Sequence, residues 1–363
     1  MLFQALLRSN PNRLEFRSLL DHSENEEATD RPDTYTTSQT LPDVQPPQAG
    51  FLVQLFLIPM VIVAAIICVW LLFNVISQSE SPTELVRGLR KMDSSSWQKA
   101  YTLSNLLRTP NSKDLKNDPE LAAELVSILE SPFDVEKADP NQVKLRVFVC
   151  RCLGELEIPE GMDALISAMQ KTDNESEIEI GRTAVESLSI LIKNLGPQSQ
   201  RRNKELLAAL VDTSNIQTQN AKMQLKVDQL RSTIGFALGV LGGEEAIRRL
   251  QGMLSDSFPN ARFNAAAGLA RHGDLSCKNV LLEMLDAESE SVVAGEEHQS
   301  SHQFKRSVVA TTAIGAVSAL SEHCEISELS DLIPAVRAAS ETDAFGGKTK
   351  VLAKELLVNI QKS

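Results

Sequence analysis

A run of nineteen apolar residues, LFLIPMVIVAAIICVWLLF from Leu55 to Phe73, constrains the fold of this chain more than any other segment. No charged residue lies between Asp43 and Glu80. A helix rises about 1.5 Å per residue, so roughly 20 apolar residues cross the ~30 Å hydrocarbon core of a bilayer. We therefore predict a single transmembrane helix at residues 51–76, and an integral, single-pass membrane protein.

The charges that flank this run predict its orientation. In the twenty residues before Phe51 the only cation is Arg31, whereas Arg87, Arg90, Lys91 and Lys99 follow the run. Cytoplasmic flanks carry an excess of Lys and Arg. We therefore expect a cell-membrane protein whose C-terminal domain faces the cytoplasm.

The remaining chain divides by composition. Residues 1–50 are predicted to be a polar, largely disordered tail, because the stretch from His22 to Gly50 is rich in Glu, Asp, Thr and Pro. Within this tail, Leu2–Leu20 could form a basic amphipathic helix on a membrane surface or remain a frayed arm. Residues 77–93 are expected to be a juxtamembrane linker or helix, and residues 94–363 a helical repeat domain.

The part of the chain after Ser77 has the pattern of short amphipathic helices. Aromatic residues are only 4% of the sequence, so the core must consist mainly of Ala, Leu, Val and Ile, and no stretch shows sustained period-two alternation. Short breaks with Pro, Gly, Asn and Asp separate the apolar stripes. We predict fourteen helices, at residues 83–91, 95–108, 119–130, 141–156, 160–171, 176–195, 201–213, 217–241, 244–255, 259–272, 275–286, 303–320, 328–340 and 347–361.

These helices repeat in sequence. Five segments align on an arginine: LRVFVCRCLGEL at Arg146, IGRTAVESLSIL at Arg182, LRSTIGFALGVL at Arg231, ARFNAAAGLARH at Arg262 and KRSVVATTAIGAV at Arg306. In four of them the residues three, four and seven positions later are small or apolar, and the Arg182 copy is slipped by one residue, with Gly181 in place of the arginine. Small residues at this spacing let stacked helix pairs approach closely and share one core.

The repeats resemble the HEAT-repeat family, in particular the short HEAT-like repeats also found in bilin lyases, here in a membrane-anchored bacterial type. The best match is LRSTIGFALGVLGGEEAIRRLQGMLSDSFPNARFNAAAGLARHGD, with its arginine, paired small residues, Leu-Gly and Asp-containing turn. The resemblance implies an all-α protein in which one transmembrane helix precedes an α-α superhelix, a HEAT-like solenoid. We interpret the five arginines as structural repeat anchors that pair with the acidic turn of the preceding repeat.

Few residues have the spacing of a chemical site. His298 and His302 have the i, i+4 spacing of two metal ligands on a helix, but the polar stretch from Ala287 to Gln303 is expected to be a loop without an evident third ligand. Cys150 and Cys152 would point about 200° apart on a helix, and we expect them in the core. The sequence contains no phosphate-binding, nucleophile-elbow or HExxH motif. We therefore predict no catalytic residues, no cofactor and no metal site, with His298 and His302 as weak metal candidates.

A formal net charge of −12 is unfavourable for binding nucleic acid, which needs a surplus of Lys and Arg. The function that these features favour is a membrane-anchored HEAT-repeat scaffold for protein-protein interaction, and not an enzyme. The alternative is an enzyme or enzyme accessory of the bilin-lyase HEAT-like type. The expected partners are one or more proteins on the solenoid surface and the membrane itself.

Overall fold

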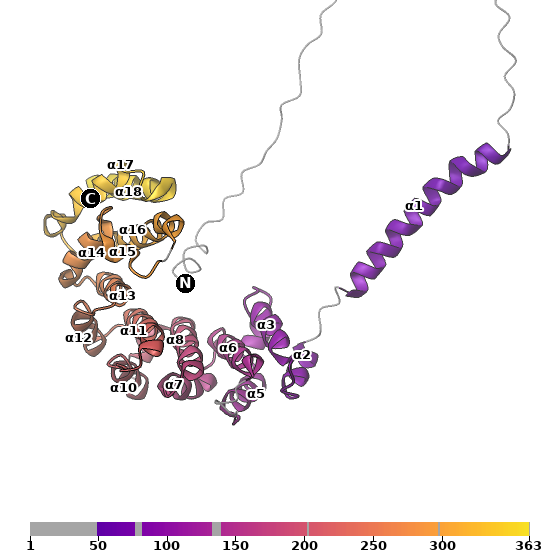
Figure 1. Ribbon diagram of the computed structural model, residues 1–363, viewed down its shortest axis with the longest axis horizontal. Helices are drawn as coiled ribbons and strands as arrows, with labels where there is room; N and C mark the ends of the chain where they lie inside the picture. The colour runs from indigo at the N-terminus through magenta and orange to yellow at the C-terminus, as the bar shows by residue number, and fades with distance from the viewer. Residues whose placement is uncertain (1–48, 77–81, 133–138, 202, 297, 363) are drawn as a thin grey trace, which may run out of the picture. The chain divides into compact units, whose positions relative to one another are not determined.

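The computed structural model describes residues 49–76, 82–132, 139–201, 203–296 and 298–362. Every element in these ranges is an α-helix or a short 3-10 helix, and none is a strand (Figure 1). The described elements fall into two units, α1 and the array from α2 onward. The helices are α1 (Ala49–Ile76), α2 (Pro82–Leu89), α3 (Ser96–Leu107), α4 (Lys113–Lys116), α5 (Pro119–Glu130), α6 (Pro140–Gly154), η1 (Pro159–Gly161), α7 (Met162–Gln170), α8 (Glu175–Leu195), α9 (Pro197–Gln200), α10 (Lys204–Thr213), α11 (Ala221–Leu241), α12 (Glu244–Met253), α13 (Pro259–Arg271), η2 (Leu275–Cys277), α14 (Lys278–Leu285), α15 (Glu290–Val293), α16 (Gln299–Ser321), η3 (Ile326–Leu329), α17 (Leu332–Glu341) and α18 (Gly346–Lys362).

Helix α1 contains the apolar run, with Pro59 inside it. Its described side chains, from Leu57 to Leu71, are all exposed. Among the described residues, no helix is both long and apolar enough to cross a bilayer. The prediction of a single-pass cell-membrane protein is therefore wrong on the described residues, and the cytoplasmic placement of the C-terminal domain, which rested on it, is withdrawn. The predicted tail, including Leu2–Leu20, lies outside the described residues.

The array from α2 onward has two layers. In the first, α2, α5, α7, α10 and α12 pack in succession, and α14 packs on α17. In the second, each of α3, α6, α8, α11, α13, α16 and α18 packs on the next, and Figure 1 shows this layer on the inner side of the row. Neighbouring first-layer and second-layer helices form pairs, and buried Leu, Ala, Val and Ile side chains form one continuous core. The predicted all-α, HEAT-like repeat fold is confirmed.

The residues at helix ends explain why the helices begin and end where they do. Asp118 and Asn174 accept hydrogen bonds from backbone N–H groups of the first turns of α5 and α8. Gly196 and Gly242, with φ of +88° and +66°, end α8 and α11 in a conformation that side chains disfavour. The sequence prediction therefore placed most long helices within a few residues of their observed bounds.

The structure extends the array beyond the predicted ranges at two places. Helix α2 corresponds to the helix predicted at 83–91, within the 77–93 linker or helix, and it packs on α3 with Leu85 and Leu89 fully buried, so the array begins before residue 94. The stretch from Ala287 to Gln303, expected to be a loop, contains α15 and the start of α16, because the adjacent Val292 and Val293 enter the core side of the array.

Candidate functional site

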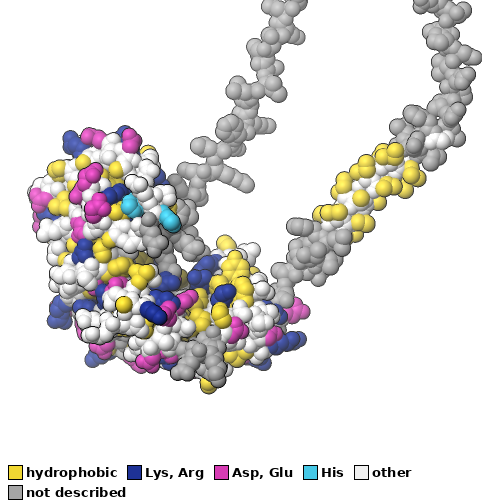
Figure 2. Space-filling model, in the orientation of Figure 1, with side chains coloured by type: hydrophobic (Ala, Val, Ile, Leu, Met, Phe, Trp, Pro, Cys, Tyr) yellow, Lys and Arg dark blue, Asp and Glu magenta, His cyan; other side chains and the backbone are white. Residues whose placement is uncertain are grey.

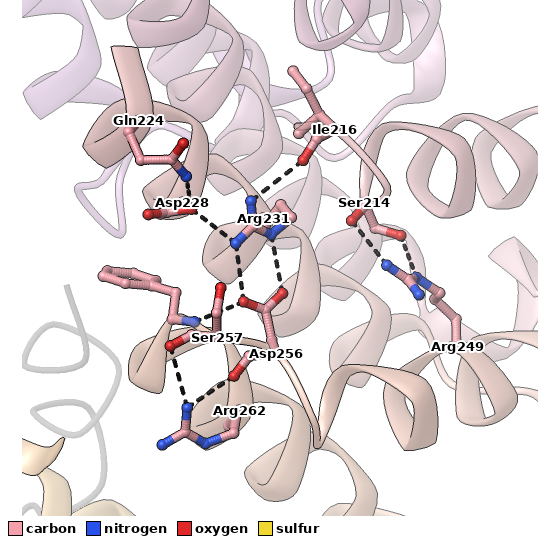
Figure 3. A network of polar contacts seen from close by, with 10 residues as sticks. Ser214, Ile216, Gln224, Asp228, Arg231, Arg249, Asp256, Ser257 and Arg262 are labelled. Carbon is pink, nitrogen blue, oxygen red and sulfur yellow. Dashed lines mark hydrogen bonds and ion pairs between the residues drawn. The ribbon is translucent and has the colours of Figure 1, made fainter. Parts of the chain in front are cut away.

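Four of the five repeat arginines contact the turn between the two helices of their own pair. Arg146 Nη2 donates to Ser131 O at 2.8 Å, and Arg231 Nη1 to Ile216 O at 3.3 Å. Arg262 Nη1 donates to Asp256 O at 2.8 Å, and Arg306 Nη1 to Ser289 O at 3.0 Å (Figure 3 shows Arg231 and Arg262). A carbonyl after the end of a first-layer helix has no intrahelical partner, and the arginine supplies one.

The acceptors differ from the acidic turn of the preceding repeat that we expected. They are mainly backbone carbonyls, and carboxylates are a second contact that points toward the following repeat. Arg231 pairs with Asp256 at 2.9 Å, and Arg262 pairs with Glu283 at 2.5 Å. Each of these arginines therefore bridges a turn of its own pair to a group of the next pair.

The fifth arginine, Arg182, has a different environment. It forms an ion pair with Glu186 one turn later in α8, at 2.6 Å. The buried Gly181 occupies the packed position, where a Cβ would lie 3.1 Å from Ala168 O and 3.2 Å from Met169 O of α7. An arginine side chain would not fit there, which is the physical reason for the slipped register.

The two candidate metal ligands lie at the start of α16. His298 is exposed at the N-cap, and a ring nitrogen of His302 lies 3.2 Å from the backbone oxygen of Glu296. Over the ranges that the structure describes, no group of three or more His, Cys, Asp or Glu side chains is placed to hold a metal ion. Within these ranges, therefore, no third metal-binding side chain lies close to His298 and His302.

The paired thiols lie in the core of α6. Cys150 and Cys152 are both fully buried, and Cys152 Sγ faces Ala100 O of α3 at 3.6 Å. Burial raises the pKa of Cys150 to about 12 and raises the pKa of Cys152 further. Both groups are therefore neutral thiols that pack between helices.

An aromatic patch lies on adjoining second-layer helices. It consists of Trp97 and Tyr101 on α3 and Phe148 on α6, with Lys144 and Arg151 of α6 at its sides. The Trp97 and Phe148 rings stack with centroids 6.3 Å apart, and Tyr101 meets Phe148 edge-on at 5.3 Å. Figure 2 shows hydrophobic side chains with basic ones beside them over these helices.

The two cations contact the rings of the aromatic patch directly. Lys144 Nζ lies 5.1 Å from the centroid of Trp97, and Arg151 Cζ lies 5.0 Å from that of Phe148. Tyr101 remains 49% exposed although it is large and apolar over most of its surface. The patch can therefore bury an apolar group of a partner while its cations attract a carboxylate.

Sequence reasoning did not identify the aromatic patch. Its signal was present as the i, i+4 spacing of Trp97 and Tyr101, and the i, i+4, i+7 spacing of Lys144, Phe148 and Arg151. Each spacing places its residues on one helix face. Only the packing of α3 on α6 brings the two faces together.

Comparison with known proteins gives matches of fold only. No protein-family model matches the chain, and no curated protein matches it. Among solved structures, the complex of CpcE and CpcF of phycocyanin lyase from Nostoc sp. PCC7120 is similar, with 15% identity, a TM-score of 0.45, and coverage of 78% of this chain and 96% of that one. Two engineered proteins of the Northeast Structural Genomics Consortium are also similar. The first has 15% identity and a TM-score of 0.35, and the match covers 77% of this chain and 95% of that one. The second has 12% identity and a TM-score of 0.25, and the match covers 76% of this chain and 77% of that one.

One of these matches corrects a prediction. We predicted that the chain is not an enzyme, and the similarity to a phycocyanin lyase complex contradicts that prediction, which we withdraw. At 15% identity the similarity concerns the helical fold, and it assigns no reaction to this chain.

Proposed function

We propose that this helical repeat protein is a scaffold that binds a partner protein through the aromatic patch. The observation that carries the proposal is the exposure of Tyr101 beside the stacked rings of Trp97 and Phe148, with a cation on either side. Trp, Tyr and Arg supply most of the binding energy at protein interfaces. Stacked helix pairs are rigid, extended supports for such contacts.

The chemistry of the patch indicates the partner segment. Its rings favour an apolar or aromatic side chain, and Lys144 and Arg151 favour acidic residues next to it. The partner segment is therefore apolar with flanking carboxylates. This local preference contrasts with the net charge of −12 of the whole chain, which repels acidic proteins elsewhere on the surface.

The test compares two patch variants with a matched control. The full chain, Tyr101→Ala, Lys144→Glu and the control Leu225→Ala are immobilised, and proteins retained from an extract of the native cells are quantified by mass spectrometry. Leu225 is 57% exposed on α11 and lies outside the patch. We expect a protein that the wild type and Leu225→Ala retain equally, and that both patch variants bind about tenfold more weakly when it is purified.

Two results would count against this function. If the four immobilised proteins retain the same set in the same amounts, the patch does not bind the partner. If the purified chain instead takes up a linear tetrapyrrole and gains its absorbance, the protein handles a chromophore, and the scaffold proposal fails as stated.

A further inference from the structure

A polar cavity of about 490 Å³ lies in the array, apart from the aromatic patch. Two turns form it, the one between α10 and α11 and the one between α12 and α13, together with residues of α11 and α12. Hydroxyl and amide side chains predominate in its lining, and the charged lining residues are Arg231, Arg249 and Asp256. Its volume is that of a small-ligand site.

The charge of Arg231 is neutralised within the protein. Its Nε and Nη2 donate to the two carboxylate oxygens of Asp256 at 3.0 and 2.9 Å, and Nη2 also lies 2.8 Å from Asp228 Oδ1 (Figure 3). The Arg231 side chain is only 8% exposed. This guanidinium is thus part of the wall of the cavity and already has its counter-ions.

The two carboxylates have little accepting capacity left for another cation. Asp256 Oδ1 also accepts the backbone N–H of Phe258 at 2.8 Å, and Asp228 Oδ1 accepts Gln224 Nε2 at 2.8 Å. Burial opposes the charge of Asp256, but the hydrogen bonds from Arg231 and Phe258 outweigh it and lower the pKa of Asp256. Both acids therefore accept their hydrogen bonds from groups other than Arg249, and Asp256 acts on Arg249 only through its charge.

Arg249 has neutral partners. Its Nε donates to Ser214 Oγ at 2.5 Å and its Nη2 to Ser214 O at 2.9 Å (Figure 3). No carboxylate of the described residues forms an ion pair with it. Burial lowers the pKa of Arg249 more than the charge of Asp256 raises it. A half-buried guanidinium whose burial is not fully compensated is unfavourable, and an anionic ligand would relieve that cost.

The remaining amino group of Arg249, Nη1, lies beside another residue of the cavity lining. Gly252, one turn on in α12, lines the cavity, and a Cβ built on it would lie 3.6 Å from Arg249 Nη1. Because glycine has no side chain, the space next to Nη1 stays open. Two nitrogens of the guanidinium, Nε and Nη2, are thus held by Ser214, and the third, Nη1, lies next to a glycine of the cavity lining.

We infer that this cavity binds the oxyanion group, a carboxylate or a phosphate, of a polar ligand, with Arg249 as the charged partner. Ser255, Ser257 and Thr218 line the same cavity and supply hydroxyl groups for the rest of the ligand. The inference is independent of the proposed function, because it uses other residues on other helices. A phosphorylated peptide side chain and a free small anion would present the same chemistry to Arg249.

The experiment titrates the full chain with inorganic phosphate, with a capped Gly-Ser-phosphoserine-Ser-Gly peptide and with the same peptide unphosphorylated. Binding is followed by the NMR shifts of the Asn215 and Ser257 amides. The variants are Arg249→Gln, Gly252→Leu, which fills the space beside Nη1, and the control Arg248→Gln, which removes the neighbouring exposed cation of α12. Thermal unfolding is recorded for each, so that Gly252→Leu keeps the test valid if Arg249→Gln is unstable.

We expect saturable binding of the two phosphate-bearing probes, with unchanged affinity in Arg248→Gln and about tenfold or greater loss in both cavity variants. Tighter binding of the phosphopeptide than of phosphate would identify a peptide as the source of the anion, and equal binding would identify a free anion. The inference is overturned if neither phosphate-bearing probe shifts these amides, or if folded Arg249→Gln and Gly252→Leu bind as the wild type does.

Discussion

Two neighbouring contacts of the second layer, α11 with α13 and α13 with α16, come from similar sequence repeats but differ in packing. In the first, Gly239 and Gly268 face each other so closely that a Cβ on Gly239 would lie 2.6 Å from the Gly268 Cα. In α16 the corresponding position, eight residues after the repeat arginine, is the buried Ile314, and the next residue, Gly315, is exposed with nothing within 4 Å of an added Cβ. The glycine is therefore a packing requirement at Gly239, whereas α16 has a larger residue at that position and a replaceable glycine beside it.

The ion pairs that lead from Arg231 and Arg262 to the next helix pair differ in burial. Arg231 and Asp256 pair at 2.9 Å with side chains 8% and 11% exposed, whereas Arg262 and Glu283 pair at 2.5 Å with side chains 18% and 26% exposed. Arg306 and Glu290, of the neighbouring α16 and α15, are 4.0 Å apart, and Glu290 is 91% exposed. The repeat arginines are 31 residues apart at the first contact and 44 at the second, from 262 − 231 and 306 − 262. The ion pair across the uninterrupted repeat is thus the most buried of the three.

The largest expected effect comes from a charge in α13, the helix that both contacts share. Ala266→Asp places a carboxylate at a fully buried position without a partner, and should lower the free energy of unfolding by about 3–5 kcal/mol. Urea unfolding followed by circular dichroism measures this loss. Ala267→Asp, at the half-exposed next position, should cost much less; equal effects would show that α13 does not have the observed register.

The second effect concerns the tight contact alone. Gly239→Ala gains about 1 kcal/mol of helix propensity but forces two backbones apart, at a cost of about 1–3 kcal/mol. We expect a net decrease in thermal stability, measured by calorimetry. An increase in the melting temperature would mean that α11 and α13 are farther apart than the Gly239–Gly268 contact requires.

The third effect tests the buried ion pair by pH. The pKa of Asp256 is lowered in the folded protein, so its contribution is full above the unfolded pKa of about 4 and is lost as pH falls through the folded value. Asp256→Asn should therefore be less stable than the wild type by about 1–2 kcal/mol at pH 7, and the gap should narrow as the pH falls below about 4. Urea unfolding at pH 7 and at a series of lower pH values gives the gap, and Glu290→Gln, at the exposed pair, should show none.

The smallest effect has the opposite sign. Gly315 lies inside α16, is exposed, and has no neighbour that a methyl group would meet. Gly315→Ala should therefore raise the free energy of unfolding by about 0.5–1 kcal/mol. If Gly315→Ala lowers the thermal stability measured by calorimetry as much as Gly239→Ala does, Gly315 is closely packed and the contrast between the two glycines is wrong.

Some elements could be predicted from the sequence because their signals are local. Asp118 before Pro119, and Asn174 before a run of Glu residues, mark helix starts through hydrogen bonds within four residues. The short α4, α9 and α15 were missed, since each has only four residues and no periodicity to detect. The apolar run at Leu55–Phe73 was detectable as a helix, but its predicted role as a membrane span was not upheld by the described residues.

The candidate sites were harder to predict, because their residues are far apart in the chain. Arg249 and Ser214 are 35 positions apart, and Tyr101 and Phe148 are 47 apart, from 148 − 101. The sequence alignment identified Arg231 and Arg262, whose regular spacing reflects a contact made in four of the five aligned pairs. The alignment did not identify Arg249, because the proposed anion-binding role of this residue depends on Asp228 and Asp256 being paired with Arg231.

The sequence by itself determined the all-helical class, the pairing of helices in repeats and the arginine that recurs in second-layer helices, since periodicity, capping and small-residue spacing act over one or two turns. Tertiary structure alone decided that Gly239 is required and Gly315 is not, that Trp97 stacks on Phe148, and that Arg249 is left without a carboxylate. The physical reason is that close approach, ring stacking and charge compensation depend on which surfaces meet. Identical local patterns meet different neighbours when an insertion changes the stacking of one repeat on the next.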